Sequence, residues 1–245
     1  MYAADGRNAA IVAVPWKGVC EVFWILLAGY SIIFGVLAAV VCRAQWKRYY
    51  VWAKVAASVS FLVVLSVAAY RGENVHSYYR MLPAFLCCFF GDILMAEYNL
   101  SRRRIYFITG LLVFLAGHLF FVRWLCTLQP LTAVDFVFPV AAVVLTFGLT
   151  SVKSVHTGKL KPAILIYSFF VALFFTKGVH LAAVQTSVSN SLIAAGSTLF
   201  LMSDISILFL YFKKTKGCLV HLFNLVTYYY GMFLLASHLM FLYYH

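Results

Sequence analysis

Two aspartates lie deep inside apolar segments of the sequence, where an ionised carboxylate is costly. Asp92 is in the middle of the stretch CCFFGDILMAEY, and Asp204 is inside GSTLFLMSDISILFLYF. A carboxylate that faces lipid costs at least a few kcal/mol, so membrane-buried acids face a bundle interior and usually mark chemistry or an ion pathway. Asp92 and Asp204 are therefore candidate catalytic residues that could donate or accept protons.

Other polar residues occur at helical spacing around these aspartates. Ser203 precedes Asp204, and His118 ends a series in which glycine, phenylalanine and histidine recur every fourth residue. Glycine on such a face allows a neighbouring helix to approach closely. Lys54 lies about one turn inside another apolar segment, where its ammonium is a natural partner for a phosphate or a carboxylate. These residues are candidates for substrate binding.

The embedded charges also permit a structural interpretation. Lys54 and Lys177 could form buried ion pairs with Asp92 and Asp204 that fix the register of the helices, and His118 could simply bond to a neighbouring helix. The remaining carboxylates lie at or near the ends of apolar segments and are expected to be solvated or interfacial. They are Asp5, Glu21, Glu73, Glu97 and Asp135.

Motifs of metal and cofactor sites are missing from the sequence. His180, His221 and His238 lack a ligand spacing such as HxxxH, and there is no HExxH, GxSxG, P-loop or dinucleotide-binding fingerprint. We therefore expect neither a metal nor a cofactor. The cysteines show no CxxC or Cys/His spacing and are interpreted as buried thiols; they are Cys20, Cys42, Cys87, Cys88, Cys126 and Cys218.

The elements that must position these residues are predicted from composition. Of 245 residues, 64% are hydrophobic and 11% are charged, whereas about a quarter of a soluble domain is charged. The apolar residues form blocks of roughly 20, the length of a membrane-spanning helix. We predict an all-α, multi-pass transmembrane helical bundle that forms a single integral membrane domain over residues 1–245. Its spans are expected at 19–42, 51–70, 81–97 (a short one), 105–125, 132–150, 162–183, 190–212 and 218–243.

Basic residues alternate between the predicted loops and indicate the orientation. The loops after the first, third, fifth and seventh spans each contain three basic residues, which makes twelve on that side of the membrane. The other side has five. By the positive-inside rule both termini are expected on the lumenal or exoplasmic side. The compartment would be the endoplasmic reticulum in a eukaryote or the inner membrane in a bacterium. The basic residues form no patch that could follow a nucleic-acid backbone, so nucleic acid is not expected as a partner, and membrane lipids are.

Five short elements occur in order along the chain and together resemble the YhhN-like lysoplasmalogenase family of eight-span membrane enzymes. They are a lysine in the second span (Lys54), a Gly-Asp stretch (GDILM, with Asp92), a Gly-x3-Phe-x3-His helix (Gly110, Phe114, His118), a Gly-x3-Phe-x2-Ser-Asp segment (Gly196, Phe200, Ser203, Asp204) and the tyrosine-rich TYYYG, which includes Tyr229. The sequence departs from the family pattern at Leu210 and near Met232, where the family often has asparagine and glutamine.

The resemblance implies a hydrolase that cleaves the vinyl-ether bond of lysoplasmalogens. These lysophospholipids would yield a fatty aldehyde and glycerophosphoethanolamine or glycerophosphocholine. It implies that Asp92 and Asp204 are catalytic and that the substrate contacts Lys54, His118, Ser203 and Tyr229. Vinyl ethers hydrolyse by protonation at carbon, and the resulting oxocarbenium ion is captured by water. One carboxyl group can donate that proton while another stabilises the cation, as in glycoside hydrolysis.

Three other functions are compatible with embedded acids. A proton-coupled transporter would use them as a pathway, although the sequence shows no internal repeat or matching pair of broken helices. A non-catalytic membrane scaffold would use them only to hold helices together. A metal-dependent membrane hydrolase would combine His118 with the aspartates. Activity of the purified protein in detergent separates an enzyme from a transporter.

Overall fold

The protein is a bundle of membrane-spanning α-helices, as the sequence predicts. The computed structural model describes residues 16–152, 158–207, 210–211 and 218–242. Within these ranges, eight helices are long and apolar enough to cross a membrane, and there are no strands. The protein is therefore an integral multi-pass membrane protein whose exposed apolar side chains contact lipid. The helices are α1 (Trp16–Cys42), α2 (Tyr50–Arg71), α3 (Val75–Ser101), α4 (Arg104–Leu128), α5 (Val134–Ser151), α6 (Lys161–Val184), α7 (Val188–Ile207) and α8 (Cys218–Ser237).

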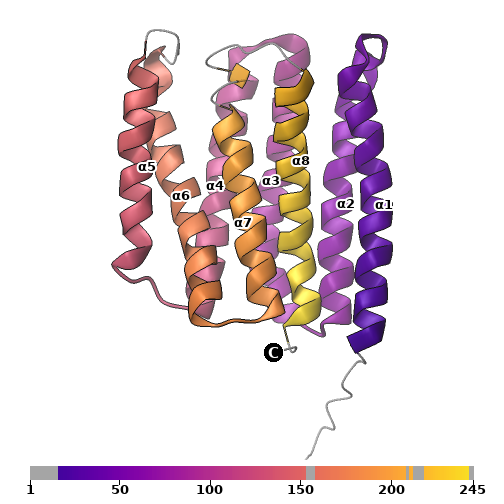
Figure 1. Ribbon diagram of the computed structural model, residues 1–245. Coiled ribbons are helices and arrows are strands. Elements are labelled where there is room, and N and C mark those ends of the chain that lie inside the picture. The colour runs from indigo at the N-terminus through magenta and orange to yellow at the C-terminus, as the bar shows by residue number, and fades with distance from the viewer. Residues whose placement is uncertain (1–15, 153–157, 208–209, 212–217, 243–245) are drawn as a thin grey trace, which may run out of the picture.

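The helices run alternately up and down (Figure 1). The end of the bundle where α1, α3, α5 and α7 finish is called the charge-rich end, and the opposite end, where α1 begins and the described chain finishes, is called the termini end. α5 lies at one edge of the bundle beside α6, and α1 lies at the other edge. Several of the basic residues used to predict orientation fall outside the described ranges; they are Arg7, Lys153, Lys213, Lys214 and Lys216. Asp5, which was expected to be solvated, also lies outside them.

Helix α3 is longer than predicted. The expected short span at 81–97 is wrong, because the helix covers 27 residues, Val75–Ser101. It begins where the Asn74 side chain accepts a hydrogen bond from the backbone N–H of Ser77 at 2.9 Å, and it ends at Arg102, which has a positive φ of 56°. The first turns are polar and aromatic, so hydropathy alone does not detect them. Asn74 can start the helix because its oxygen satisfies a free N–H of the first turn.

Glycines allow close helix contacts, as their spacing predicts. A Cβ on Gly91 of α3 would lie 2.8 Å from the ring of Phe114 on α4. A Cβ on Gly196 of α7 would lie 2.7 Å from the Leu235 side chain and 3.0 Å from the backbone oxygen of Gly231, both on α8. These glycines allow α3 to pack closely against α4, and α7 against α8. Asp92 lies on α3 and Asp204 lies on α7.

Two cysteines are paired, contrary to the expectation of buried thiols. A disulfide joins Cys42, at the end of α1, to Cys218, at the start of α8, with 5.9 Å between the Cα atoms. The two are 176 residues apart and meet only because α1 ends and α8 begins at the charge-rich end. Of the four free cysteines, only Cys88 is fully buried.

Asp135 is buried, so the expectation that it is solvated or interfacial is wrong. It has no exposed surface, and its carboxylate lies 3.3 Å from Lys177 Nζ and 2.7 Å from His180 Nδ1 on α6. Lys177 also donates to the carbonyl of Pro130 at 2.7 Å. Asp135, Lys177 and His180 form the Asp135 cluster, near the termini end. The sequence could not reveal this burial because the α4–α5 connection, which covers Asp135, has no apolar pattern.

Candidate functional site

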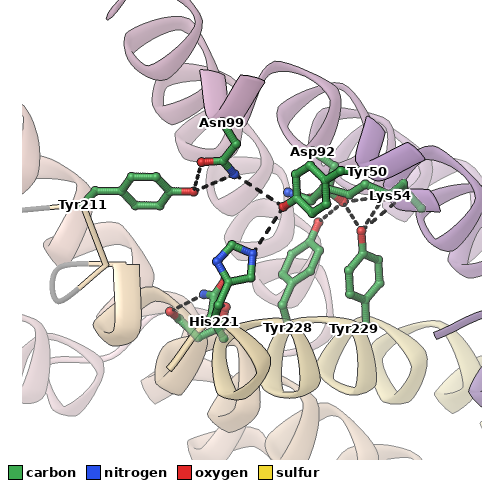
Figure 2. A network of polar contacts seen from close by, with 11 residues as sticks. Tyr50, Lys54, Asp92, Asn99, Tyr211, His221, Tyr228 and Tyr229 are labelled. Carbon is green, nitrogen blue, oxygen red and sulfur yellow. Dashed lines mark hydrogen bonds and ion pairs between the residues drawn. The ribbon is translucent and has the colours of Figure 1, made fainter. Parts of the chain in front are cut away.

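Asp92 lies at the meeting point of α2, α3 and α8. Its Oδ1 is 3.0 Å from Lys54 Nζ, and its Oδ2 accepts hydrogen bonds from Ser58 Oγ at 2.6 Å and from the Tyr228 hydroxyl at 2.9 Å (Figure 2). Lys54 and Ser58 are four residues apart on α2, so they face the same side of that helix. Asp92 is only 1% exposed, and its partner Lys54 is 7% exposed. The structural ion pair considered for these two residues is therefore present.

The polar groups around Asp92 are all hydrogen-bond donors. An ammonium group and two hydroxyl groups direct protons at its oxygens, which accept them. Because the Ser58 proton is directed at Asp92, the Tyr229 hydroxyl, 3.1 Å from Ser58 Oγ, donates to Ser58 in turn. Tyr229 thus supports Asp92 through a short chain of hydroxyl groups.

Asp204 lies at a second meeting point, formed by α4, α6 and α7. Its Oδ1 accepts a hydrogen bond from the Tyr167 hydroxyl at 3.0 Å, and its Oδ2 is 3.3 Å from His118 Nε2. The alignment of the last two atoms is not that of a hydrogen bond, and neither atom has a hydrogen-bond partner among the described residues. The side chain of Asp204 is 8% exposed and that of His118 is completely buried. The Asp204 site therefore contains two buried polar atoms that face each other unsatisfied.

Aromatic rings separate the two carboxylates. The Tyr228 ring, whose hydroxyl donates to Asp92, packs edge-to-face on Phe200 at a centroid distance of 5.3 Å. Phe200 in turn packs on the His118 ring at 4.8 Å. The Cys88 thiol, one turn before Asp92, lies within electrostatic range of both Asp92 and Asp204. The two acids therefore belong to one region of the bundle but have different immediate surroundings.

The predicted site residues thus fall into two groups. Lys54 and Tyr229 are brought to Asp92, and His118 is brought to Asp204. Ser203 is adjacent to Asp204 in sequence, but its hydroxyl and its carbonyl both accept hydrogen bonds from the Asn224 amide on α8 at 2.9 Å. This serine therefore connects α7 to α8, and its hydroxyl is engaged by that helix.

Sequence reasoning missed three partners of the site, namely Tyr167, Tyr228 and Asn224. Each forms its contact with a residue on another helix, so no spacing within its own helix indicates it. The tyrosine-rich TYYYG stretch was a signal for Tyr228, because it neighbours Tyr229. Where the family pattern often has polar groups, Leu210 is half-buried and Met232 is fully buried, so both supply apolar surface.

A second polar network, also missed, lies between Lys54 and the charge-rich end. Asn99 exchanges hydrogen bonds of 3.2 and 3.3 Å with the Tyr211 hydroxyl and donates to the Tyr50 hydroxyl at 3.4 Å. The Tyr50 hydroxyl also lies 3.4 Å from His221 Nε2 (Figure 2). Burial raises the pKa of Tyr211 to about 12, so its phenol is neutral and can donate. The network joins α2, α3 and α8 with uncharged groups.

The fold and the site define an integral membrane protein with eight spans and two buried, differently partnered carboxylates. Among the described residues, no three His, Cys, Asp or Glu side chains lie together as metal ligands would. The model of the YhhN family matches residues 52–239, which include every candidate site residue from Lys54 to Tyr229. The chain belongs to the YhhN family, which is the lysoplasmalogenase family. Neither the curated proteins nor the solved structures include a match to the chain.

Proposed function

We propose that this protein is a hydrolase that cleaves the vinyl-ether bond of lysoplasmalogens by acid–base catalysis with Asp92 and Asp204. The observation that supports this most directly is the unequal surroundings of the two buried carboxylates. Asp92 is paired with a lysine and two hydroxyl groups, whereas Asp204 faces a histidine and one phenol. Two carboxyl groups in different surroundings can serve as acid and as anionic stabiliser in one reaction.

The roles follow from these surroundings. Asp204 is the acid that protonates the alkenyl carbon, and the ionised Asp92 stabilises the oxocarbenium ion that forms. Water then captures the cation, and the hemiacetal breaks down to a fatty aldehyde and the glycerophospho alcohol. The parallel with glycoside hydrolysis is close, since a carboxyl pair there flanks a transition state of the same charge type. This mechanism uses only proton transfer and charge stabilisation.

Lys54 orients the substrate in this proposal. It lies in the first turns of α2, on the side of Asp92 that faces the charge-rich end, so a lipid phosphate near that end could reach its ammonium. Tyr229 and His118 act through Asp92 and Asp204, respectively. Ser203 contributes by holding α7 against α8. The lysophospholipid would enter from the membrane, with its alkenyl chain among the apolar side chains.

The test is mass spectrometry of lysoplasmenyl lipids incubated with the purified protein, beside the ester-linked analogues. We expect release of fatty aldehyde from the vinyl ether and no cleavage of the ester. Asp92→Asn and Asp204→Asn should each lower turnover by at least about 100-fold, the usual contribution of one acid–base group. Glu97→Gln, a half-buried carboxylate on the same helix as Asp92 with no polar contact of its side chain among the described residues, should retain wild-type turnover.

Three outcomes would contradict the proposal. Purified protein that leaves lysoplasmenyl lipids intact, while well folded by thermal unfolding, would favour a transporter or a scaffold. Full turnover in either aspartate variant, at wild-type expression, would remove that residue from the catalytic pair. Loss of activity on chelation would favour a metal-dependent reaction.

A further inference from the structure

The hydrogen bond at the far side of the His118 ring determines its tautomer. His118 Nδ1 lies 2.8 Å from the carbonyl oxygen of Phe114, one turn earlier on α4. A carbonyl oxygen can only accept, so Nδ1 must bear a proton and donate it. In a neutral imidazole the other nitrogen, Nε2, then has a lone pair and no proton. Nε2 lies 3.3 Å from Asp204 Oδ2.

Two acceptors therefore lie close together in a buried place. His118 Nε2 and Asp204 Oδ2 are 3.3 Å apart, and neither has a hydrogen-bond partner among the described residues. With no proton between them, both atoms remain unsatisfied, and a buried acceptor without a partner is unfavourable. With two protons, an imidazolium would face a carboxylic acid, and one proton would lack an acceptor. A single proton makes one of the two atoms a donor and leaves the other an acceptor.

The surroundings of the pair contain no competing cation among the described residues. The other carboxylate oxygen of Asp204, Oδ1, accepts a hydrogen bond from the Tyr167 hydroxyl of α6 at 3.0 Å. The His118 ring is enclosed by Tyr167, Phe174 and Phe200 at centroid distances of 5.4, 5.9 and 4.8 Å. From α3, the Cys88 thiol lies within electrostatic range of Asp204, and α8 presents Tyr228 against Phe200. The ammonium of Lys54 is paired with the other aspartate.

We propose that Asp204 and His118 share one proton, and that His118 is a positioning residue that keeps Asp204 supplied with the proton it donates. This inference rests on the proposed vinyl-ether hydrolysis for its catalytic meaning. The proton passes from Asp204 Oδ2 to the alkenyl carbon that is not bonded to oxygen, and the electron pair of the double bond forms the new C–H bond. Water adds to the oxocarbenium carbon and returns a proton to the Asp204–His118 pair. The hemiacetal hydroxyl proton then moves to the ether oxygen as the C–O bond breaks, so one water is consumed and the pair is restored.

The proton can be observed without any substrate. In ¹⁵N-histidine-labelled protein in lipid nanodiscs at neutral pH, NMR reports whether His118 Nε2 is protonated, and infrared difference spectroscopy reports a protonated carboxyl group that Asp204→Asn removes. We expect one of these two signals and not both: an imidazolium without the carboxyl band, or the carboxyl band with a neutral ring. His238 is an internal control, because its Nδ1 also bonds to a carbonyl, that of Leu235 at 2.7 Å, while its Nε2 lacks a hydrogen-bond partner and no carboxylate is paired with it in the described chain. Its ring should be neutral.

A neutral His118 together with no carboxyl band from Asp204 would overturn the proposal, and so would both signals together. The kinetic consequence is that His118→Gln lowers kcat about 100-fold with little change in KM. Tyr230→Phe, which loses only a bond to Ser31 at 3.0 Å outside the site, should retain wild-type kcat. A shared proton in a protein that does not hydrolyse lysoplasmenyl lipids would reject the proposed function and leave the pair intact. Hydrolysis of lysoplasmenyl lipids without a shared proton would reject the shared proton and leave the proposed function intact.

Discussion

At the scale of residues, the site uses the same side chain twice with different partners. Asp92 accepts from three donors, Lys54, Ser58 and Tyr228. Asp204 instead lies beside His118, whose Nδ1 donates to a backbone carbonyl oxygen. In a water-poor interior such partners decide the protonation of each acid, because bulk water is not there to do so. Chemically identical aspartates can therefore have opposite roles.

The Lys54–Asp92 pair gives a prediction at this scale. In Lys54→Met the carboxylate of Asp92 loses its only ion-pair partner among the described residues while it remains 1% exposed. Removing one member of a buried ion pair costs about 3–5 kcal/mol, since the other charge is left uncompensated. We expect a lower free energy of unfolding in detergent for Lys54→Met, and recovery of most of that loss in the Lys54→Met/Asp92→Asn double variant. A double variant that is as unstable as the sum of the two single variants would show that Lys54 acts through packing alone.

At the scale of elements, the close contact of α7 with α8 sets the geometry of both carboxylates. α7 presents Asp204, and α8 presents Tyr228 to Asp92. Gly196 and Gly231 face each other where these helices touch, and the Asn224 amide binds Ser203 nearby. A change in the separation of α7 and α8 would therefore alter the surroundings of both acids at once.

Gly196→Ala tests this contact. The added methyl group would lie 2.7 Å from Leu235 and 3.0 Å from the Gly231 carbonyl oxygen, and a backbone atom cannot move without moving α8. We expect a cost of about 1–3 kcal/mol, typical of overpacking, measured as a lower Tm in detergent, together with reduced turnover. The matched control is Gly29→Ala on α1, where an added Cβ meets nothing within 4 Å. An unchanged Tm for Gly196→Ala would contradict the role given to this contact.

The Asp135 cluster has a comparable role at the edge of the bundle. Lys177 on α6 binds Asp135 of α5 and the carbonyl of Pro130 in the α4–α5 connection. It thereby fastens three consecutive segments at the termini end. α6 also presents Tyr167 to Asp204, so the cluster helps to hold one wall of the site. Its three charged or titratable members are satisfied by one another and by the backbone, which fits a structural role.

At the scale of the whole molecule, charge distribution and the disulfide make a joint prediction about orientation. By the positive-inside rule, twelve basic residues against five predict that the charge-rich end lies in the cytosol. The cytosol keeps thiols reduced, and the Cys42–Cys218 pair lies at that end. We therefore expect both cysteines to be free thiols in intact cells and to form the disulfide once the protein is purified without reductant.

Rapid alkylation of intact cells followed by mass spectrometry measures the redox state of Cys42 and Cys218. Protease protection of an N-terminal tag measures the orientation independently. Recovery of the disulfide-linked peptides from alkylated cells, together with a tag that is accessible from the cytosol, would reverse the orientation that we propose. Cys88, which is fully buried, is an internal control that should remain unlabelled in folded protein.

The sequence by itself determined the class of fold, the number of spans and the main polar residues. Blocks of about 20 apolar residues can cross lipid only as helices, because every backbone group must be satisfied internally. The embedded position of Asp92, Asp204, Lys54 and His118 follows from the same blocks, since polar groups are conspicuous inside them. These inferences depend on local composition, which a single sequence contains in full.

Only the tertiary structure decided which of these residues meet. Lys54 could have paired with either aspartate, and Lys177 was expected near the same acids, but α6 directs it to Asp135 at the other end of the bundle. The pairing of Cys42 with Cys218 and the hydrogen bond of Tyr167 to Asp204 were likewise decided by the tertiary structure alone. Spacing along one helix fixes the face on which a side chain lies, but not the neighbouring helix that it touches. That choice depends on how the helices pack, and therefore on contacts between residues far apart in the sequence.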